Sequence, residues 1–194
     1  MTPEDIGTSL VEAVGDGASS SVSSGGTHAR ATVDVPVEHW RQAATAARDL
    51  LGCDFFDWLS AVDEGEAGFD VVAHVWSSQQ RHGVLLRTRV PRDMPAVDTV
   101  VDIYPGAGWH ERETAEMFGI DMVGHPNLVP LRLPAEFEGR PLRKEYVVAS
   151  RVVKPWPGAK EPGGEGGAKA RQPARPLGVP SPDEWGPAVA PPVD

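Results

Sequence analysis

Three glutamates within six residues are the side chains in this sequence best suited to chemistry. Glu111, Glu113 and Glu116 lie in one short segment, with His110 beside them and His125 further along. Paired carboxylates can act as acid and base when their surroundings separate their pKa values. Histidines can in addition hold a metal ion. One hypothesis is therefore a hydrolase that uses these groups.

The spacing of these residues does not favour a hydrolase. The sequence contains no His-Glu-x-x-His pattern, no nucleophile elbow and no phosphate-binding loop. On a helix the side chains of residues 111, 112, 113 and 116 point in several directions. Arg112 could pair with Glu116 one turn away. Such a segment fits either an ordinary solvated helix or a helix clamped between other elements, with its carboxylates bound by arginines or backbone amides.

A second charged segment covers residues 133–146. It is rich in charge and proline, unlike a core element, and cannot place all of its side chains inward. We expect an extended ribbon that lies over a surface, either of this chain or of a partner.

These two segments resemble the signature of the 30-kilodalton subunit of respiratory complex I. The family pattern reads Trp-x-Glu-Arg-Glu-x-x-Asp-Met-Phe-Gly-Ile, then Gly-His-Pro, then Glu-Gly-His-Pro-Leu-Arg-Lys-Asp-Tyr. The fit covers about forty residues, in three ordered motifs. The matching residues are Trp109, Glu111, Arg112, Glu113, Met117, Phe118, Gly119, Ile120, Gly124, His125, Pro126, Glu138, Gly139, Pro141, Leu142, Arg143, Lys144 and Tyr146.

The chain also departs from that pattern. Ala115 stands where an aromatic residue is common, and Val129 and Pro130 stand where arginine is often found. The other departures are Glu116, Phe137, Arg140 and Glu145, in place of aspartate, tryptophan, histidine and aspartate. Contacts with a partner are therefore expected to differ from those of other members.

The resemblance implies a non-catalytic structural subunit of a proton-translocating NADH:quinone oxidoreductase. It implies a place in the peripheral arm, near the quinone module. The implied partners are the hydrogenase-like large subunit and the adjacent small cluster-bearing subunit. Flavin, iron–sulfur clusters, NADH and quinone would all be bound by partner subunits and none by this chain.

The charged residues would lock the helix and the ribbon to the large subunit. Gly119 would permit a turn, and His125 with Pro126 would fix the following loop. The implied interface residues are Trp109, Glu111, Arg112, Glu113, Glu116, Phe118, Gly119, His125, Pro126, Pro141, Leu142, Arg143, Lys144 and Tyr146.

Composition limits the remaining possibilities. Cys53 is the single cysteine, so this chain alone cannot form an internal disulfide or hold an iron–sulfur cluster. The formal charge of −10 argues against nucleic acid as a partner. The sequence has neither a run of about twenty apolar residues nor the features of a signal peptide. We expect a peripheral protein on the cytoplasmic side of the cell membrane, in contact with the membrane only through other subunits.

Two alternatives stay open. Membrane-bound hydrogenases and dehydrogenases that use ferredoxin or another donor have equivalent subunits, and this chain contains nothing that reports the electron donor. A free-standing adaptor outside any respiratory complex is the second alternative.

Composition also divides the chain into three zones. Residues 1–30 would form a loosely held helix, Glu4 to Val14, followed by a flexible Gly/Ser linker. Residues 31–149 carry the periodic pattern of a folded domain. Residues 150–194 would form an extended or disordered tail, since ten of the nineteen prolines lie from Lys154 onward.

The patterns within the domain predict an α+β fold. Strands and helices do not alternate as in a doubly wound fold, so we expect a small, mostly antiparallel or mixed sheet with packed helices. The expected strands are residues 32–37, 55–62, 69–76 and 83–90. The expected helices are residues 37–51, 96–103 and 109–118.

Overall fold

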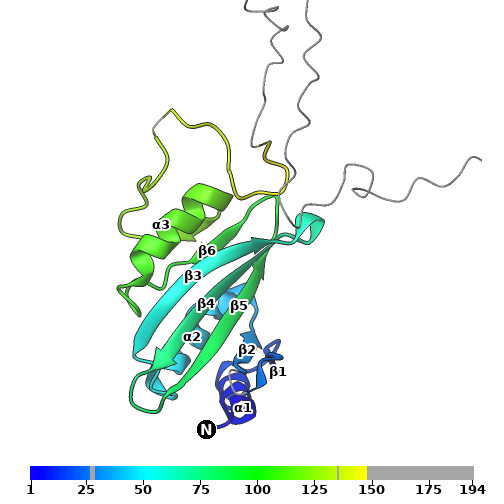
Figure 1. The fold of residues 1–194 in the computed structure, drawn as a ribbon, viewed down its shortest axis with the longest axis vertical. Coiled ribbons are helices and arrows are strands. Elements are labelled where there is room, and N and C mark those ends of the chain that lie inside the picture. The colour runs from blue at the N-terminus through cyan, green and yellow to red at the C-terminus, as the bar shows by residue number, and fades with distance from the viewer. Residues whose placement is uncertain (27–28, 135, 148–194) are drawn as a thin grey trace, which may run out of the picture. The chain divides into compact units, whose positions relative to one another are not determined.

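The computed structural model describes residues 1–26, 29–134 and 136–147 (Figure 1). At its centre is a five-stranded sheet with the order β1-β2-β5-β4-β3. β2 pairs with β5 in parallel, and the other neighbouring strands are antiparallel. The prediction of an α+β fold with a mixed sheet is confirmed. The strands are β1 (Ser19–Val22), β2 (Ala31–Asp34), β3 (Phe55–Asp63), β4 (Phe69–Ser77) and β5 (His82–Val90).

The three long strands lie where alternating apolar residues predicted them. In β4 the alternate residues Val71, Ala73 and Val75 are buried, and in β5 Val84 and Leu86 are buried. These side chains project from one face of the sheet, because successive residues of a strand point to opposite faces. A short 3-10 helix, Gly65–Ala67, connects β3 to β4.

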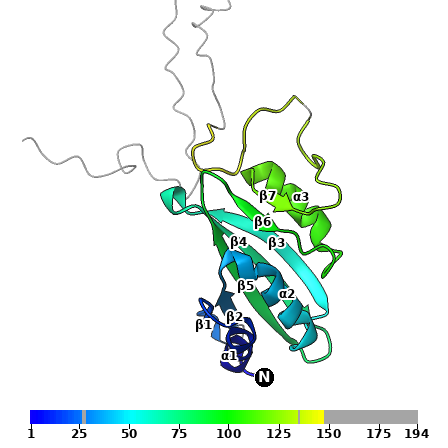
Figure 2. The same ribbon diagram turned by 180° about the vertical axis from the view of Figure 1, so that it is seen from behind.

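The helix expected over residues 37–51 is present with a modified start. A 3-10 turn, Val37–His39, leads into α2 (Trp40–Asp49). Trp40, Ala43 and Ala47 of α2 are buried. α2 lies across the face of the sheet that Figure 2 turns toward the viewer. On the opposite face, seen in Figure 1, no helix of the described residues crosses β4 and β5.

The N-terminal helix is part of the core, so the prediction of a loosely held helix is wrong. α1 (Pro3–Val14) begins with a capping box in which Thr2 and Asp5 bind each other's backbone amide. Its apolar residues Ile6, Leu10 and Val14 are buried. Composition could not show this, because it does not indicate that α1 packs against β1, β2 and α2.

The predicted flexible linker is also wrong for Ser19–Val22. These residues form β1, which pairs along its length with β2. All four are exposed, so it is the backbone pairing, not side-chain burial, that makes this segment a strand.

The helix expected over residues 96–103 is absent. Ala96–Asp98 instead forms β6, which pairs in parallel with β7 (Asp121–Val123), and residues 101–103 form a turn. Val97 and Val100 point into the core as expected. A short strand followed by a turn can give the same apolar spacing as one helical turn, so the pattern did not distinguish them.

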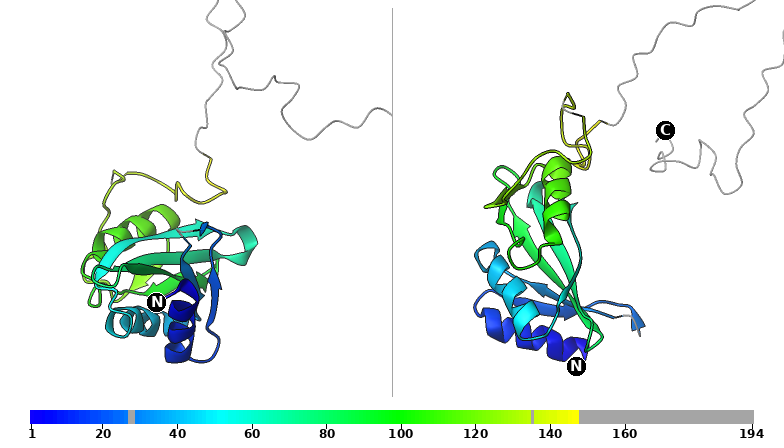
Figure 3. Two further views of the ribbon diagram at one scale, coloured as in Figure 1. Left: turned by 60° about the horizontal axis from the view of Figure 1, so that its bottom comes forward. Right: turned by 90° about the vertical axis from the view of Figure 1, so that its left-hand side faces the viewer.

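The last helix, α3 (Ala107–Phe118), confirms the prediction for residues 109–118 and begins two residues earlier. It lies beside β3, as the right-hand view of Figure 3 shows. The Phe118 ring contacts the Phe69 ring of β4 edge to face, with centroids 6.1 Å apart. The expected tail, residues 150–194, lies outside the described residues, and the division into three zones stays a prediction.

Candidate functional site on helix α3

The first buried carboxyl group of α3 belongs to Glu111. Its side chain is 1% exposed. It accepts hydrogen bonds from the Thr99 hydroxyl and from the Val100 amide, the latter at 2.8 Å. Burial raises the pKa of Glu111 although both hydrogen bonds oppose that rise. Glu111 therefore holds the turn after β6 against α3.

His125 lies close to this carboxyl and ties the loop after β7 to the start of α3. Its Nδ1 accepts a hydrogen bond from the Asn127 amide at 3.0 Å, which assigns the proton to Nε2. Nε2 then donates to the Gly108 carbonyl at 3.1 Å and lies 4.0 Å from Glu111 Oε2. Pro126, the next residue, lines a neighbouring hollow beside Arg41.

Glu116 is the second buried carboxylate, and three successive backbone amides bind it. Leu131, Arg132 and Leu133 donate to it at 3.2, 2.9 and 2.8 Å. Burial acts to raise the pKa of Glu116, but these amide bonds outweigh it and hold the pKa below its usual value. Of the two alternatives, a solvated helix and a clamped helix, the contacts of Glu116 agree with the clamped helix.

Arg112 does not form the expected direct pair with Glu116 among the described contacts. Its Nε and Nη2 donate to the carbonyls of Val129 and Pro130, at 2.9 and 3.0 Å. Its charge still contributes to lowering the pKa of Glu116. Both residues therefore hold the same loop onto α3.

The crossing segment, residues 128–134 and 136–147, also covers the C-terminal end of α3. Arg140 donates to the Glu116 carbonyl at 3.0 Å, and Arg143 Nε donates to the Phe118 carbonyl at 2.5 Å. The Leu142 amide donates to the Met117 carbonyl at 3.3 Å. The last carbonyls of a helix lack partners within it, and positive charge is favourable there.

Gly119 makes this close crossing possible. Its φ of +71° is in the left-handed region, which ends the helix. A Cβ at this position would lie 2.8 Å from Arg140 Nε and 3.0 Å from Arg143 Nη2. A side chain would therefore displace both arginines.

Asp63, at the end of β3, anchors the far end of the crossing segment. Burial opposes its ionisation, but bonds from the Lys144 amide, the Arg92 guanidinium and the Gly65 amide lower its pKa to about 2. Arg92 also pairs with Glu145. Sequence patterns missed Asp63 and Arg92, since neither is in the charged segments.

Aromatic contacts complete this anchor. The guanidinium groups of Arg92 and Arg143 both lie 5.1 Å from the centroid of the Phe69 ring. Further along, Tyr146 stacks on Phe137 with centroids 6.0 Å apart. The crossing segment is thus fixed on the surface of its own chain by charge, backbone and ring contacts.

The three glutamates of α3 do not converge on one site. Glu113 is partly exposed and pairs with Arg132 at 2.7 Å, whereas Glu111 and Glu116 are buried in separate surroundings. The His110 ring contacts Phe56, with centroids 5.5 Å apart. Within the described ranges no group of three or more His, Cys, Asp or Glu side chains could hold a metal ion. This geometry does not assemble the paired carboxylates that a hydrolase would use.

Other signature residues remain accessible. Trp109, on the first turns of α3, is 69% exposed, and Leu142 is 53% exposed. Pro141 and Tyr146 are half-buried, and Lys144 is exposed. The assignment of these residues to a subunit interface stays a prediction.

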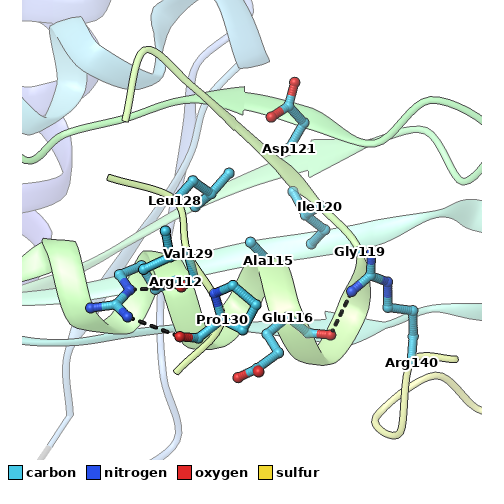
Figure 4. A pocket seen from close by; sticks show the side chains of 10 residues that line it. All are labelled: Arg112, Ala115, Glu116, Gly119, Ile120, Asp121, Leu128, Val129, Pro130 and Arg140. Carbon is cyan, nitrogen blue, oxygen red and sulfur yellow. Dashed lines mark hydrogen bonds between the residues drawn. The ribbon is translucent and has the colours of Figure 1, made fainter. Parts of the chain in front are cut away.

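A pocket of about 340 Å³ lies on one flank of α3, as Figure 4 shows. Ala115 lines it from α3, and Ile120 lines it from the segment just after the helix. Val129 and Pro130 line it from the crossing segment. Arg112 and Arg140 stand at opposite ends of the view.

Comparison with known sequences places α3 and the crossing segment in a known family. Residues 33–152, more than half of the chain, match the family described as respiratory-chain NADH dehydrogenase, 30 Kd subunit. The chain belongs to this family. The matched range includes both segments, so the 30 Kd family signature coincides with the contacts described above.

Two curated relatives illustrate the likeness. A subunit of NADH-quinone oxidoreductase from Roseiflexus castenholzii is 41% identical over 101 residues, which are 51% of this chain and 58% of that protein. A subunit of NADH-quinone oxidoreductase from Erwinia tasmaniensis is 40% identical over 90 residues, which are 46% of this chain and 15% of that protein. The chain therefore matches less than two thirds of the length of either relative.

A solved structure shares the fold. A chain of the membrane-bound sulfane sulfur reductase, an archaeal respiratory membrane complex, is 22% identical and superposes with a TM-score of 0.60. The match covers 81% of this chain and 96% of that chain. Among the described residues, no helix is both long and apolar enough to cross a membrane.

Proposed function

We propose that this chain is a non-catalytic structural subunit of the peripheral arm of a proton-translocating NADH:quinone oxidoreductase. It docks against the hydrogenase-like large subunit near the quinone module, with the small cluster-bearing subunit adjacent. It is held on the cytoplasmic side of the cell membrane through other subunits. The observation that carries this proposal is the match of residues 33–152 to the 30 Kd subunit family.

The buried charges of the signature act within the chain in this proposal. Glu111 is inaccessible to a partner, and Glu116 is occupied by three amides. Glu111 holds the turn after β6 against α3, and Glu116 holds the crossing segment on the same helix. A rigid, preformed surface loses less conformational entropy when it binds a partner.

Trp109 and Leu142 are the side chains that we assign to direct docking. Tryptophan is enriched among the residues that contribute most to interfaces, and an exposed one on a fixed helix is ready to enter a partner's pocket. Glu113 and Arg132 pair at the surface and would form part of a polar rim. This set is smaller than the set that the sequence resemblance implied.

We assign no cofactor to this chain, and place flavin, iron–sulfur clusters, NADH and quinone in partner subunits. Cys53 supports this assignment because it is buried, and burial raises the pKa of its thiol to about 12. A thiol that stays protonated at neutral pH is a poor metal ligand and a poor nucleophile.

Affinity purification of the tagged chain from gently solubilised native membranes, followed by mass spectrometry, tests the proposal. We expect the hydrogenase-like large subunit together with the flavin- and NADH-binding subunits. A chain that is recovered alone would refute the proposal and favour the free-standing adaptor.

Recovery of the large subunit without the NADH-binding module would also contradict the proposed electron donor. It would instead identify the equivalent subunit of a membrane-bound hydrogenase or of a dehydrogenase that uses ferredoxin or another donor. The fold does not decide between these, since it is shared with a chain of a sulfane sulfur reductase.

A further inference from the structure

The Glu111 carboxyl and the His125 imidazole are two buried ionisable groups that lie close together. Their side chains are 1% and 3% exposed, and Glu111 Oε2 lies 4.0 Å from His125 Nε2. Glu111 belongs to α3, whereas His125 belongs to the loop that follows β7. Two groups at such a distance take up and release protons as a pair rather than independently.

The protonation state of His125 follows from its two hydrogen bonds. Nδ1 accepts from the Asn127 amide at 3.0 Å, so this nitrogen carries no proton. Nε2 therefore carries the ring proton, and it donates to the Gly108 carbonyl at 3.1 Å. A second proton can bind the ring only at Nδ1, where an amide hydrogen already points.

A proton at Nδ1 is incompatible with the bond from Asn127. Both ring nitrogens of an imidazolium are donors, and two N–H groups cannot share one hydrogen bond. Asn127 is exposed, so this side of the ring is close to the solvent. The solvent can therefore supply the proton, and a water molecule can accept from the amide that is set free.

We propose that Glu111 and His125 form a proton-operated latch on the loop of residues 124–127. When His125 is neutral, its Nδ1 holds the Asn127 amide and the loop is closed. When Nδ1 takes up a proton from water, the amide is released, and the imidazolium is stabilised by the neighbouring Glu111 carboxylate. Gly124 begins the loop with a φ of +80°, and a glycine there allows the backbone to rearrange.

The charges that face the pair from other elements partly offset one another. Arg41 of α2 acts on Glu111, but it also forms two hydrogen bonds with Asp102. Asp98 of β6 acts on Arg41 as well. Asp121 of β7 is exposed and lines the pocket of Figure 4 instead. The other ionisable residues of α3 each contact another part of the chain, as described above: His110, Arg112, Glu113 and Glu116.

The Glu111 carboxyl competes with His125 for the added proton, because burial raises its pKa. The hydrogen bonds from Thr99 and Val100 oppose that rise. A proton on Glu111 leaves the latch closed, since the described contacts of this carboxyl do not include Asn127. Proton uptake therefore opens the loop only to the extent that His125 takes the proton.

NMR of the full-length, ¹⁵N-labelled chain tests the latch without any substitution. The nitrogen chemical shifts of the His125 ring report its protonation. Hydrogen exchange of the Asn127 amide, corrected for the intrinsic exchange rate at each pH, reports the bond. Between about pH 8 and pH 5, where histidines commonly titrate, we expect both to change with one midpoint. Protection of the amide should fall by about fivefold, as loss of one hydrogen bond implies.

Two substitutions of His125 form a matched pair. His125→Asn keeps an acceptor near the position of Nδ1 but does not titrate in this range, so protection of the Asn127 amide should not depend on pH. His125→Gln keeps a donor near the position of Nε2 but places no acceptor at Nδ1, so protection should be low at every pH. Glu111→Gln removes the carboxylate and should move the midpoint of loop release to lower pH by about one unit or more.

Three results would overturn the inference. The His125 ring could stay neutral across this range in the folded chain, or it could titrate while protection of the Asn127 amide stays constant. A midpoint that is unchanged in Glu111→Gln would show that the carboxylate is not part of the latch. All of these measurements use the chain on its own, so their outcome is independent of the proposed subunit function.

Discussion

The Glu116 carboxylate accepts a 2.8 Å hydrogen bond from the Leu133 amide, seventeen residues further along the chain. The two preceding amides bind the same carboxylate. The loop that carries these amides belongs to no helix or strand, so a side chain has to provide the acceptors that regular structure would otherwise supply. One ionised group on α3 thus holds residues 131–133 of the crossing segment.

Replacing Glu116 with glutamine should lower the free energy of unfolding by about 1–3 kcal/mol at neutral pH. Glutamine has the same shape but offers only one acceptor oxygen, and its NH₂ group would face amide donors. Urea denaturation of the two proteins, followed by circular dichroism, measures the difference. Glu113→Gln is the matched control on the same helix and should change stability by less than about 0.5 kcal/mol.

The free energies of unfolding of the wild type and of Glu116→Gln should differ less at acidic pH. The pKa of Glu116 is lowered in the folded chain, so its contribution is fully present above the pKa of the unfolded chain and is lost as pH falls through the folded value. Denaturation at pH 7 and at successively lower pH tests this sign. A difference that stays constant down to strongly acidic pH would show that the carboxylate charge is not what binds the loop.

Glu111 should show the opposite pH dependence. Burial raises its pKa, so the folded chain binds this proton more tightly than the unfolded chain. The wild type should therefore lose stability relative to Glu111→Gln as pH rises from the unfolded pKa through the folded pKa. Glutamine can still accept from the Val100 amide. Melting temperatures recorded from pH 4 to pH 8 test this, and parallel curves for the two proteins would contradict it.

Gly119→Ala should destabilise the chain by about 1–2 kcal/mol or more, because a residue with a Cβ is strained in the left-handed region. The new methyl group would also meet Arg140 Nε. The double variant Gly119→Ala with Arg140→Ala separates the two effects in a mutant cycle. If backbone strain alone is responsible, the two substitutions will be additive, whereas a clash with Arg140 will make the double variant less destabilised than the sum.

The sequence predicted elements well wherever one segment carried its own pattern. The alternation along residues 69–76 and 83–90 marked β4 and β5, because these strands bury one face. It failed where a segment is a strand because of its partner and carries no alternating pattern of its own. Ser19–Val22 is a strand only because β2 lies beside it, and Ala96–Asp98 is a strand only because β7 does.

The candidate site was likewise predicted only in part from the sequence. The charged string on α3 left a solvated and a clamped helix open, and the amides that bind Glu116 agree with the clamped one. Its binding partners could not be foreseen, since Leu131 and Leu133 carry no polar side chain that would mark them. Asp63 and Arg92 likewise lie in an ordinary hairpin and an ordinary loop, and their importance depends on where Lys144 arrives.

A final prediction separates residues that shape α3 from those that dock it. Sequence resemblance suggested that Arg143 acts mainly in assembly, but its bond to the Phe118 carbonyl and its place over the Phe69 ring indicate a role in stability. Arg143→Ala should lower the free energy of unfolding of the isolated chain by about 1–3 kcal/mol.

Trp109→Ala should affect assembly and leave the stability of the isolated chain nearly unchanged. Its side chain is 69% exposed, so its loss should change stability by less than about 0.5 kcal/mol. Its loss should nevertheless weaken co-purification of the large subunit, since a buried interface tryptophan commonly contributes about 2 kcal/mol or more to binding. Urea denaturation of both variants, together with quantitative mass spectrometry of the purified complexes, measures each effect. Normal assembly with Trp109→Ala would place the docking surface elsewhere than the outer side of α3.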